Sequence, residues 1–234
     1  MIHWLAQSHE VVPQTAVTGG SFQFLSEKEA ARLASLKTEK RRRDWLLGRW
    51  TTKRLLQTVV WETQNTTVPL DLITVSNNAD GVPTIESQLP MVNGQFSISI
   101  SHSHGHALVT AVAKPVWPIG CDLELIKPRS EAFIDDYFTE TEALLVRQVA
   151  GTQRDTLVTA VWSAKESVLK ALHLGLSVDT RAISCLIDPG ERPSDSWVRF
   201  KIRCDNTRLP KEAPHFSGWW RTMNHFVMTL VVKQ

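Results

Sequence analysis

Four charged side chains in two separate stretches of the chain could together handle a metal ion and a phosphate ester. Asp122 and Glu124 alternate in the segment 119–125, so on a β-strand both carboxylates project from the same face. Glu166 and Lys170 are at positions i and i+4, so on a helix both side chains leave the same face. Carboxylates are ligands that Mg²⁺ prefers, with water and substrate phosphate completing its shell. The two stretches predict a site for an oxygen-liganded metal and a pyrophosphate.

Each pair also has a simpler interpretation. Two acids that alternate on a strand can form a solvated face, and a Glu–Lys pair on a helix surface contributes only about 0.2–0.5 kcal/mol. Taken separately, each pair is better explained in that way. A third carboxylate and a lysine added to the pair of acids favour the functional interpretation.

Two further groups of side chains suggest phosphate or metal contacts. His102, His104 and His106 alternate along the chain, and on one strand they would extend over about 13 Å and could not converge on one ion, although two of them could. The segment 37–54 is rich in lysine and arginine. A charged helix face is the default explanation, and a phosphate-binding role for Arg43 and Arg49 is the alternative.

Hydrophobic periodicity predicts a mixed α+β chain. Ser26 precedes an acidic first turn and predicts a helix start, and further helices are expected over 41–57, 140–149 and 154–174. Strands are expected over 68–75, 96–101, 119–125, 197–202 and 225–232, with a turn at Asn77–Gly81.

A weak internal similarity suggests that one half-domain is duplicated. The segment Phe24–Ala30 resembles Phe138–Ala143, and each precedes a helical stretch with a tryptophan and a lysine, which we align as Trp45 with Trp162 and Lys53 with Lys170. Chance similarity between two amphipathic helices is the alternative. Duplication predicts two halves, residues 1–114 and 115–234.

Composition limits the class of protein. The 234 residues carry a net charge of +2, which gives no general attraction to nucleic acid or membrane. Three cysteines without a C-x-x-C pair support neither a disulfide framework nor a thiolate metal site. With no recognisable export signal or membrane span, we expect a cytoplasmic protein without membrane or nucleic-acid partners.

The charged residues fall in a known pattern. The segment Ile119–Glu124, with G-x-D-x-E, followed by Trp162–Lys170, with W-S-x-K-E-S-x-x-K, resembles the two-part signature of the phosphopantetheinyl transferase superfamily. Ser99–Ser103 is similar to the N-I-S-H-S strand end of its long members, which resemble the surfactin-synthetase-activating transferase, and Arg43–Arg49 is similar to their basic helix. The resemblance covers about residues 25–176.

This resemblance implies a fold and an activity. The fold would have two pseudo-symmetric α+β halves, each a small antiparallel sheet packed with a long helix, with the active site in the cleft between them. The residues 1–114 would contact the coenzyme A nucleotide, and residues 115–234 would hold the metal site and the catalytic helix. The enzyme would be a monomer of the holo-acyl-carrier-protein synthase type. It would move 4'-phosphopantetheine from coenzyme A to a serine of an acyl or peptidyl carrier protein and release 3',5'-ADP.

The resemblance also assigns roles to single residues. Asp122, Glu124 and Glu166 would bind Mg²⁺, with Mn²⁺ as an alternative ion. Glu166 would act as base, directly or through a metal-bound water, and Lys170 and Asp122 would complete the catalytic set. Contacts to coenzyme A would come from Arg43, Arg49, Ser101, His102, Asp122 and Lys170.

Some positions depart from the family pattern. Val82 replaces the lysine of a G-K-P turn, Ser99 replaces an asparagine, and Asp44 stands where a basic residue is common, which leaves Arg43 or Arg49 as the substitute. Glu142 resembles a family glutamate near the site, although a favourable interaction with a helix dipole explains it equally well. Lys127 and Arg129 could meet an acidic carrier protein.

Two other functions fit part of the pattern. A metal-dependent nuclease would also combine acids, a Glu–Lys pair and a basic helix, and a non-catalytic module could bind coenzyme A or a carrier protein. The near-zero net charge speaks against the nuclease, and the complete set of acids with Lys170 speaks for retained chemistry. The pattern does not distinguish between carrier proteins of different pathways or between coenzyme A and its acylated forms.

Overall fold

The computed structural model describes residues 1–13, 22–191 and 196–234 and has the expected α+β architecture. Its internal contacts divide the chain into two compact units, Met1–Trp117 and Pro118–Gln234, which we call the N-terminal and C-terminal units. No helix in the described part of the chain is long and apolar enough to cross a membrane.

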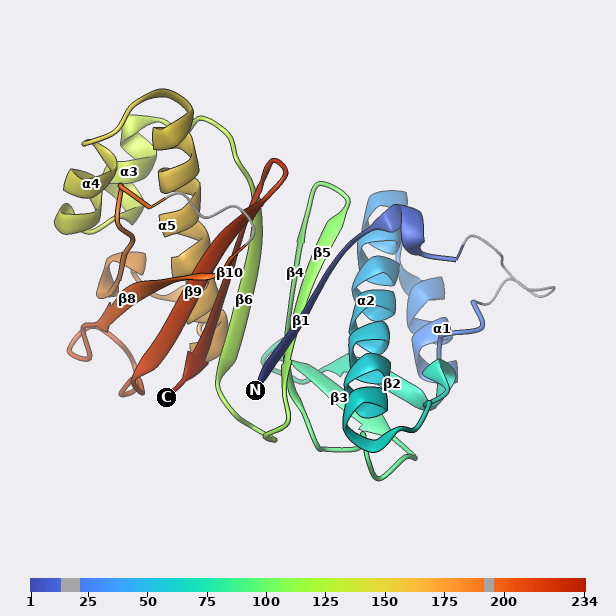
Figure 1. Cartoon of the computed structure of the whole chain (residues 1–234). Helices are drawn as coiled ribbons and strands as arrows, with labels where there is room; N and C mark the ends of the chain where they lie inside the picture. The colour runs from blue at the N-terminus through green and yellow to red at the C-terminus, as the bar shows by residue number, and fades with distance from the viewer. Residues whose placement is uncertain (14–21, 192–195) are drawn as a thin grey trace. The chain divides into compact units, whose positions relative to one another are not determined.

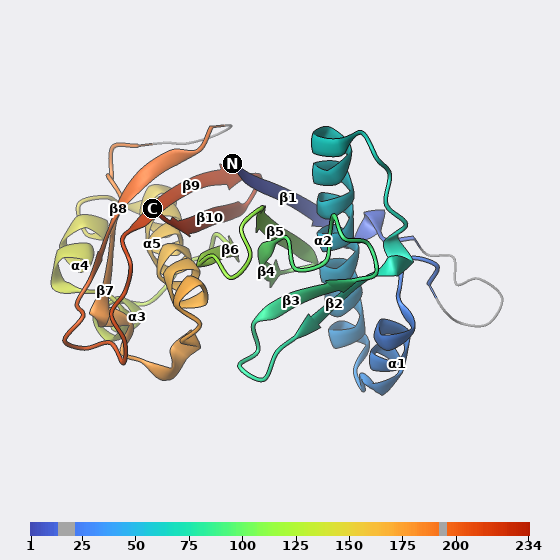
Figure 2. The ribbon, with the colours of Figure 1, turned by 90° about the horizontal axis from the view of Figure 1, so that it is seen from below.

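The N-terminal unit packs one long helix on a small antiparallel sheet (Figure 1). Its sheet has the strand order β1-β5-β4, and β2 and β3 form a separate hairpin. Figure 2 shows this hairpin beside α2 and the sheet. The elements are β1 (Ile2–Ser8), the 3-10 helix η1 (His9–Val11), α1 (Glu27–Ser35), α2 (Glu39–Gln64), η2 (Leu70–Leu72), β2 (Ile73–Asn77), β3 (Pro83–Ser87), β4 (Ser97–Ser103) and β5 (His106–Val112).

The C-terminal unit is built in the same way. Helix α5 packs against β6 and β10 of an antiparallel sheet with the order β6-β10-β9-β8-β7 (Figure 1). The elements are β6 (Ile119–Leu125), α3 (Glu131–Tyr137), α4 (Glu140–Val146), α5 (Gly151–Leu172), η3 (Gly175–Ser177), η4 (Thr180–Ala182), β7 (Ile183–Leu186), β8 (Val198–Cys204), β9 (Phe216–Met223) and β10 (Phe226–Lys233).

Most of the elements predicted from periodicity are present. Helix α1 starts after Ser26 with a full capping box to Glu29, and β6 has the predicted bounds. The strand predicted over 68–75 is partly wrong, because η2 follows Pro69 and β2 begins only at Ile73. No range was predicted for strands β1, β3, β5, β7 and β9.

The three alternating histidines do not lie along one strand, so that expectation is wrong. His104 and Gly105 both have positive φ values, 46° and 75°, and form the two-residue turn between β4 and β5. His106 is therefore on the neighbouring strand, opposite Ser103. The described residues contain no group of three His, Cys, Asp or Glu side chains that could hold a metal ion.

The two units repeat one topology, which supports the predicted duplication. In each, the first strand pairs with the last, and the last forms a hairpin with the strand before it: β1, β5 and β4 in one unit, and β6, β10 and β9 in the other. In each, a short capped helix, α1 or α4, precedes the long helix, α2 or α5.

A buried Glu–Lys pair recurs at the same place in both units. In the N-terminal unit, Lys53 pairs with Glu29, whose other oxygen accepts a hydrogen bond from the backbone of β2 (2.9 Å). In the C-terminal unit, Lys165 pairs with Glu142 (2.8 Å), whose other oxygen accepts from the backbone of β7 (2.6 Å). All four side chains are at least 98% buried.

These contacts correct the alignment of the two halves. The counterpart of Lys53 is Lys165, not Lys170, because both lysines contact the glutamate of the preceding capping box. Trp50–Lys53 then aligns with Trp162–Lys165, so Trp50 replaces Trp45 as the counterpart of Trp162. The sequence similarity was real, but its register along the long helix was wrong.

Replacing Lys53 or Lys165 by methionine should destabilise its unit by about 3–5 kcal/mol, because the partner glutamate remains buried without its cation. Urea unfolding followed by tryptophan fluorescence measures the loss. Lys28→Met is the matched control, since it removes the exposed Lys28–Glu86 pair, and such pairs contribute only about 0–1 kcal/mol. Similar small losses in all three variants would contradict this role of the buried pairs.

Candidate active site in the C-terminal unit

Strand β6 lies unusually close to helix α5 because of Gly120. A Cβ atom at Gly120 would lie 1.9 Å from the backbone oxygen of Ser167 on α5, so no other residue fits without moving the strand or the helix. Asp122 follows two positions later on β6 and therefore faces the same helix. The glycine of the G-x-D-x-E motif thus brings the acids of β6 to α5.

Lys170 and Asp122 form the direct contact between the two predicted stretches. The Lys170 Nζ atom lies 2.7 Å from Asp122 Oδ1 and donates a second hydrogen bond to the Cys121 carbonyl (3.1 Å). Asp122 is only 4% exposed. Burial alone would lower the pKa of Lys170, but Asp122, Cys121 and Glu166 together outweigh it and the net pKa is raised. The lysine therefore stays charged beside the carboxylate.

The other two acids lie within electrostatic reach of this pair. Burial, followed by the charge of Asp122, raises the pKa of Glu124 and of Glu166 above the ordinary glutamate value. Glu124 also raises the pKa of Glu166. The structure thus places all four predicted residues of the C-terminal unit in one electrostatically coupled group.

The donor chemistry of this group fits a divalent cation, although its side chains do not form a finished ligand set. A shared cation would offset the burial and the mutual repulsion that raise the pKa values of Glu124 and Glu166. In the present rotamers no three of the described acids are gathered around one point, and Lys170 contacts Asp122. Metal binding by Asp122, Glu124 and Glu166 would therefore need side-chain rotation.

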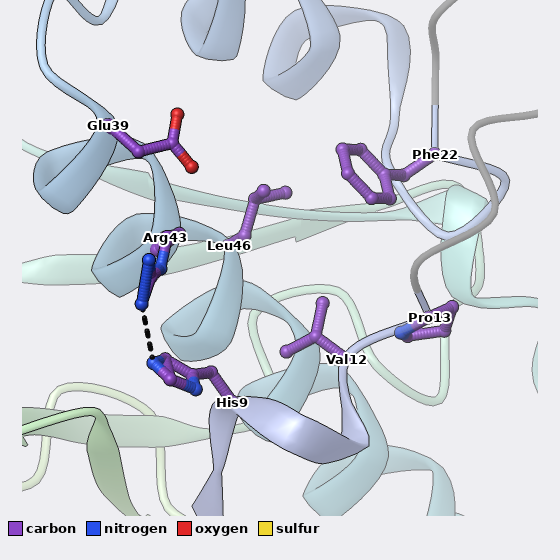
Figure 3. Close-up of a pocket in the computed structure, with 7 residues that line it drawn as sticks. All are labelled: His9, Val12, Pro13, Phe22, Glu39, Arg43 and Leu46. Carbon is purple, nitrogen blue, oxygen red and sulfur yellow. Dashed lines mark hydrogen bonds between the residues drawn. The ribbon is translucent and has the colours of Figure 1, made fainter.

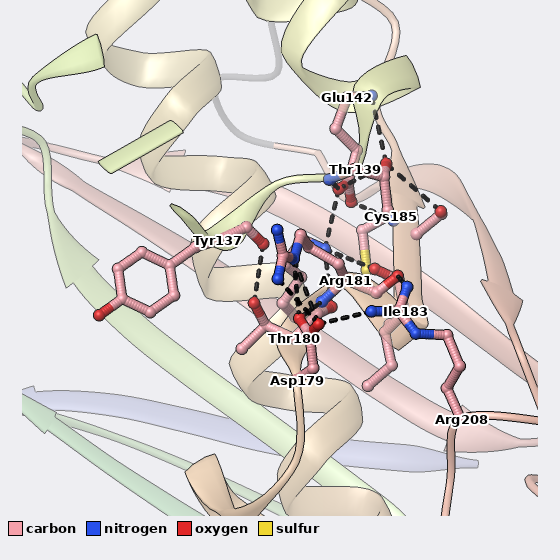
Figure 4. A network of polar contacts seen from close by, with 11 residues as sticks. Tyr137, Thr139, Glu142, Asp179, Thr180, Arg181, Ile183, Cys185 and Arg208 are labelled. Carbon is pink, nitrogen blue, oxygen red and sulfur yellow. Dashed lines mark hydrogen bonds and ion pairs between the residues drawn. The ribbon is translucent and has the colours of Figure 1, made fainter. Parts of the chain in front are cut away.

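The buried pair of Lys165 and Glu142 fixes the orientation of α5. Lys165 donates to the Thr180 carbonyl (3.0 Å) and the Ile183 carbonyl, in addition to Glu142. Figure 4 shows Glu142 near Thr139 and Cys185, and its side chain is completely buried. Glu142 resembled a family glutamate near the site, but here it caps α4 and neutralises Lys165.

Neighbouring polar contacts in Figure 4 serve the fold. Thr180 donates to the Tyr137 carbonyl (2.8 Å), and Asp179 accepts from Arg181 and Arg208. Hydrogen bonds from Arg181 lower the pKa of Asp179 to about 2. This network fastens the segment between α5 and β7, on which Lys165 depends.

The N-terminal unit repeats the scaffold without the acids. Counting from the first residue of each strand, Leu5 and Gln7 of β1 stand where β6 has Asp122 and Glu124. On the long helix, the residue after the buried lysine is Arg54 in place of Glu166. Only one of the two units therefore carries the candidate chemistry.

His102 and Ser101 differ in their surroundings. His102, at the end of β4, is exposed and its ring fills the space above Gly48 of α2, where an added Cβ would lie 2.5 Å from Nε2. Ser101 is 5% exposed. The imidazole is thus the accessible group of this predicted pair.

Arg43 and Arg49, both on α2, also differ. Arg43 is exposed, contacts His9 Nε2 (3.2 Å) and lines a cavity of about 330 Å³ with Glu39 and Leu46 (Figure 3). Arg49 is 7% exposed and donates to the Val75 carbonyl and to Asn77, and burial lowers its pKa to about 10. Arg49 thus fastens α2 to β2, and Arg43 is the accessible arginine of the two.

Sequence reasoning gave no role at the site to two residues that the structure brings forward. His9 contacts Arg43, and Arg129 lies 3.7 Å from Glu124. His9 belongs to no recognised motif, because its contact depends on the end of β1 meeting α2. Arg129 had been assigned to the surface on charge alone.

Gly120→Ala should destabilise the C-terminal unit strongly, because its Cβ would collide with helix backbone. Gly48→Ala is the matched control: its Cβ would collide with the exposed His102 ring, which can rotate away, and would make an ordinary contact with Ile100 (3.5 Å). We expect Gly120→Ala to cost at least about 1–3 kcal/mol, the usual range for overpacking, and Gly48→Ala to cost less. Thermal unfolding of both variants tests the difference, and equal melting temperatures would contradict the tight β6–α5 contact.

Comparison with known proteins finds a family model that spans this part of the chain. The model of the 4'-phosphopantetheinyl transferase superfamily matches residues 118–223, which include the four charged residues. A search of curated proteins found no match.

Several solved structures are similar to parts of the chain. Thermotoga maritima holo-(acyl-carrier-protein) synthase has 19% identity and a TM-score of 0.38 and covers 58% of this chain and 73% of its own. The Bacillus anthracis synthase in complex with CoA (3',5'-ADP) has 19% identity and a TM-score of 0.36. The match covers 49% of this chain and 95% of that synthase. The Helicobacter pylori synthase in complex with coenzyme A has 17% identity and a TM-score of 0.36. The match covers 49% of this chain and 100% of that synthase.

All three TM-scores are below 0.5, so the assignment rests on the family match and on the motifs within it. The C-terminal unit, over residues 118–223, matches the 4'-phosphopantetheinyl transferase superfamily.

Proposed function

We propose that this protein transfers 4'-phosphopantetheine from coenzyme A to a serine of an acyl or peptidyl carrier protein and releases 3',5'-ADP. The observation that carries the proposal is the contact between Lys170 and Asp122, which joins the two halves of the family motif, with Glu124 and Glu166 coupled to it. We further propose that the chain is of the long, two-half type and acts as a cytoplasmic monomer.

Lys170 is the cation that would bind the pyrophosphate of coenzyme A. The Lys170 side chain is 30% exposed and the Asp122 side chain 6% exposed, so Lys170 is the more accessible side chain of the pair. It can therefore donate to a phosphate oxygen while Asp122 holds it in place. Positioning of two bound reactants in this way can supply about 7–11 kcal/mol of the barrier.

Glu166 is the acid best suited to take the proton of the serine. Within the described part of the chain, Asp122 pairs with Lys170 and Glu124 with Arg129, while Glu166 has no ion-pair partner. Its raised pKa moves it toward the pH of catalysis, as a general base requires.

The reaction then follows from these positions. The serine oxygen attacks the phosphorus that carries pantetheine, Glu166 accepts the hydroxyl proton, and the bond from that phosphorus to the bridging oxygen breaks. The electron pair of that bond leaves with 3',5'-ADP, whose phosphate oxygen Lys170 stabilises. Mg²⁺ held by Asp122, Glu124 and Glu166 would neutralise charge on the pyrophosphate oxygens. Mn²⁺ could replace it at such a site.

The nucleotide end of coenzyme A would be bound by the N-terminal unit. The exposed residues of this unit that could contact the nucleotide are His102 and Arg43. Ser101 and Arg49 are buried and would act by holding β4 and α2 in place.

Incubation with Mg²⁺, coenzyme A and an apo carrier protein should produce the phosphopantetheine mass increase on the carrier, detected by mass spectrometry. Glu166→Gln should lower the rate by at least about 10²-fold, because general base catalysis contributes 10²–10⁴. Glu140→Gln, at an exposed acid on α4, should retain the rate of the wild type. Cleavage of DNA without transfer would support a nuclease, and binding of coenzyme A without transfer would support a non-catalytic module.

Glu166→Gln should also make the metal-free protein more stable at neutral pH. A carboxyl whose pKa is raised on folding holds its proton more tightly in the folded state, so its ionisation costs stability as the pH rises past the unfolded pKa. The neutral glutamine avoids this cost. In EDTA, the melting temperature of the variant should exceed that of the wild type at pH 7, and the difference should vanish at a pH below the unfolded glutamate pKa of about 4.3. A lower melting temperature of the variant at pH 7 would contradict the raised pKa.

A further inference from the structure

We infer that Arg129 is a positioning residue that holds the Glu124 carboxylate in its place beside Asp122 and Glu166. The inference rests on the proposed function, because it assigns Glu124 to the metal site. It adds a residue outside both parts of the motif.

The Arg129 guanidinium lies beside the Glu124 carboxylate and is mostly shielded from solvent. Its Nη2 atom lies 3.7 Å from Glu124 Oε2, and the two side chains are only 20% and 25% exposed. Screening by water is weaker for such a pair than for an exposed one. Since the guanidinium approaches Oε2, the other carboxylate oxygen of Glu124 stays available for a ligand.

A column of aromatic contacts joins Arg129 to helix α5, which carries Glu166 and Lys170. The guanidinium lies 4.7 Å from the centre of the Phe133 ring, and Phe133 packs edge-on against Trp162 of α5 at 5.2 Å. Trp162 lies one helical turn before Glu166 on the same face of α5. The column therefore fixes Glu124 of β6 relative to the helix that carries Glu166 and Lys170.

The backbone at Arg129 is also tied to α5. Arg154, near the start of that helix, donates to the Arg129 carbonyl (3.3 Å) and pairs with Glu131. The segment after β6 is thus held to α5 at both its backbone and its side chain. With only 20% of its side chain exposed, Arg129 contributes more to this internal arrangement than to the contact with an acidic carrier protein predicted from charge.

The arrangement has the form expected around a metal ligand. Carboxylates that bind metals are usually held by hydrogen bonds or ion pairs from a second layer of residues, and loss of such a partner costs 10–100-fold in metal affinity. Lys170 holds the Asp122 carboxylate by a hydrogen bond, and Arg129 holds the Glu124 carboxylate by an ion pair.

Titration of the protein with Mn²⁺, followed by electron paramagnetic resonance, tests this role without turnover. Arg129→Met keeps the apolar contact with Phe133 but removes the charge, and it should weaken Mn²⁺ binding by about 10–100-fold. Arg129→Lys should restore part of that loss. In the transfer assay, Arg129→Met should lower kcat while the KM for coenzyme A stays near that of the wild type.

Arg147→Met is the matched control, because Arg147 also joins two carboxylates, Glu131 and Asp135, but at an exposed place apart from the acids of the site. It should leave Mn²⁺ binding unchanged. Wild-type Mn²⁺ affinity in a folded Arg129→Met protein would overturn the role of Arg129 and leave the proposed function intact. A wild-type protein that neither binds Mn²⁺ nor transfers phosphopantetheine would overturn both.

Discussion

The candidate site depends on a lysine that no water can reach. Lys165 is completely buried, so its charge must be satisfied inside the protein, and Glu142 with the carbonyls of Thr180 and Ile183 does this. These partners fix the rotation of α5 about its axis. Since successive residues of a helix differ by about 100° in direction, burial of Lys165 turns the next residue, Glu166, toward the side where β6 carries its acids. The K-E pair of the motif thus combines one residue that orients the helix with one that is available for chemistry.

Duplication separates the requirements of the fold from those of the chemistry. The capping box, the buried Glu–Lys pair and the strand order occur in both units, so these features serve the fold. The acids occur only in the C-terminal unit, where Gly120 also allows β6 to approach α5. The N-terminal unit presents different side chains, such as the exposed Arg43 and His102.

Local patterns predicted much of the fold, and long-range contacts explain the errors. The cap at Ser26 and the alternation in 119–125 depend on neighbours in sequence, and both predictions were correct. The role of Lys53 was misaligned because its glutamate partner lies on another helix. Strand β5 was missed because its residues are almost all buried and show no alternation, and the turn at His104–Gly105 was missed with it. Arg129 had no local signal at all, since its role depends on Phe133 and Trp162 being side by side.

The charge balance of the site suggests why these acids can remain close together in a folded protein. Three carboxylates repel one another, and burial adds to the cost of ionising them. Lys170 pairs with Asp122, and Arg129 offsets only part of the cost at Glu124, so burial and repulsion still raise the pKa of both Glu124 and Glu166. An ionised carboxylate in such surroundings is stabilised by either a cation or a proton. A cation and a proton would therefore compete at Glu166, because either one recovers the stability that ionisation of this buried carboxyl costs.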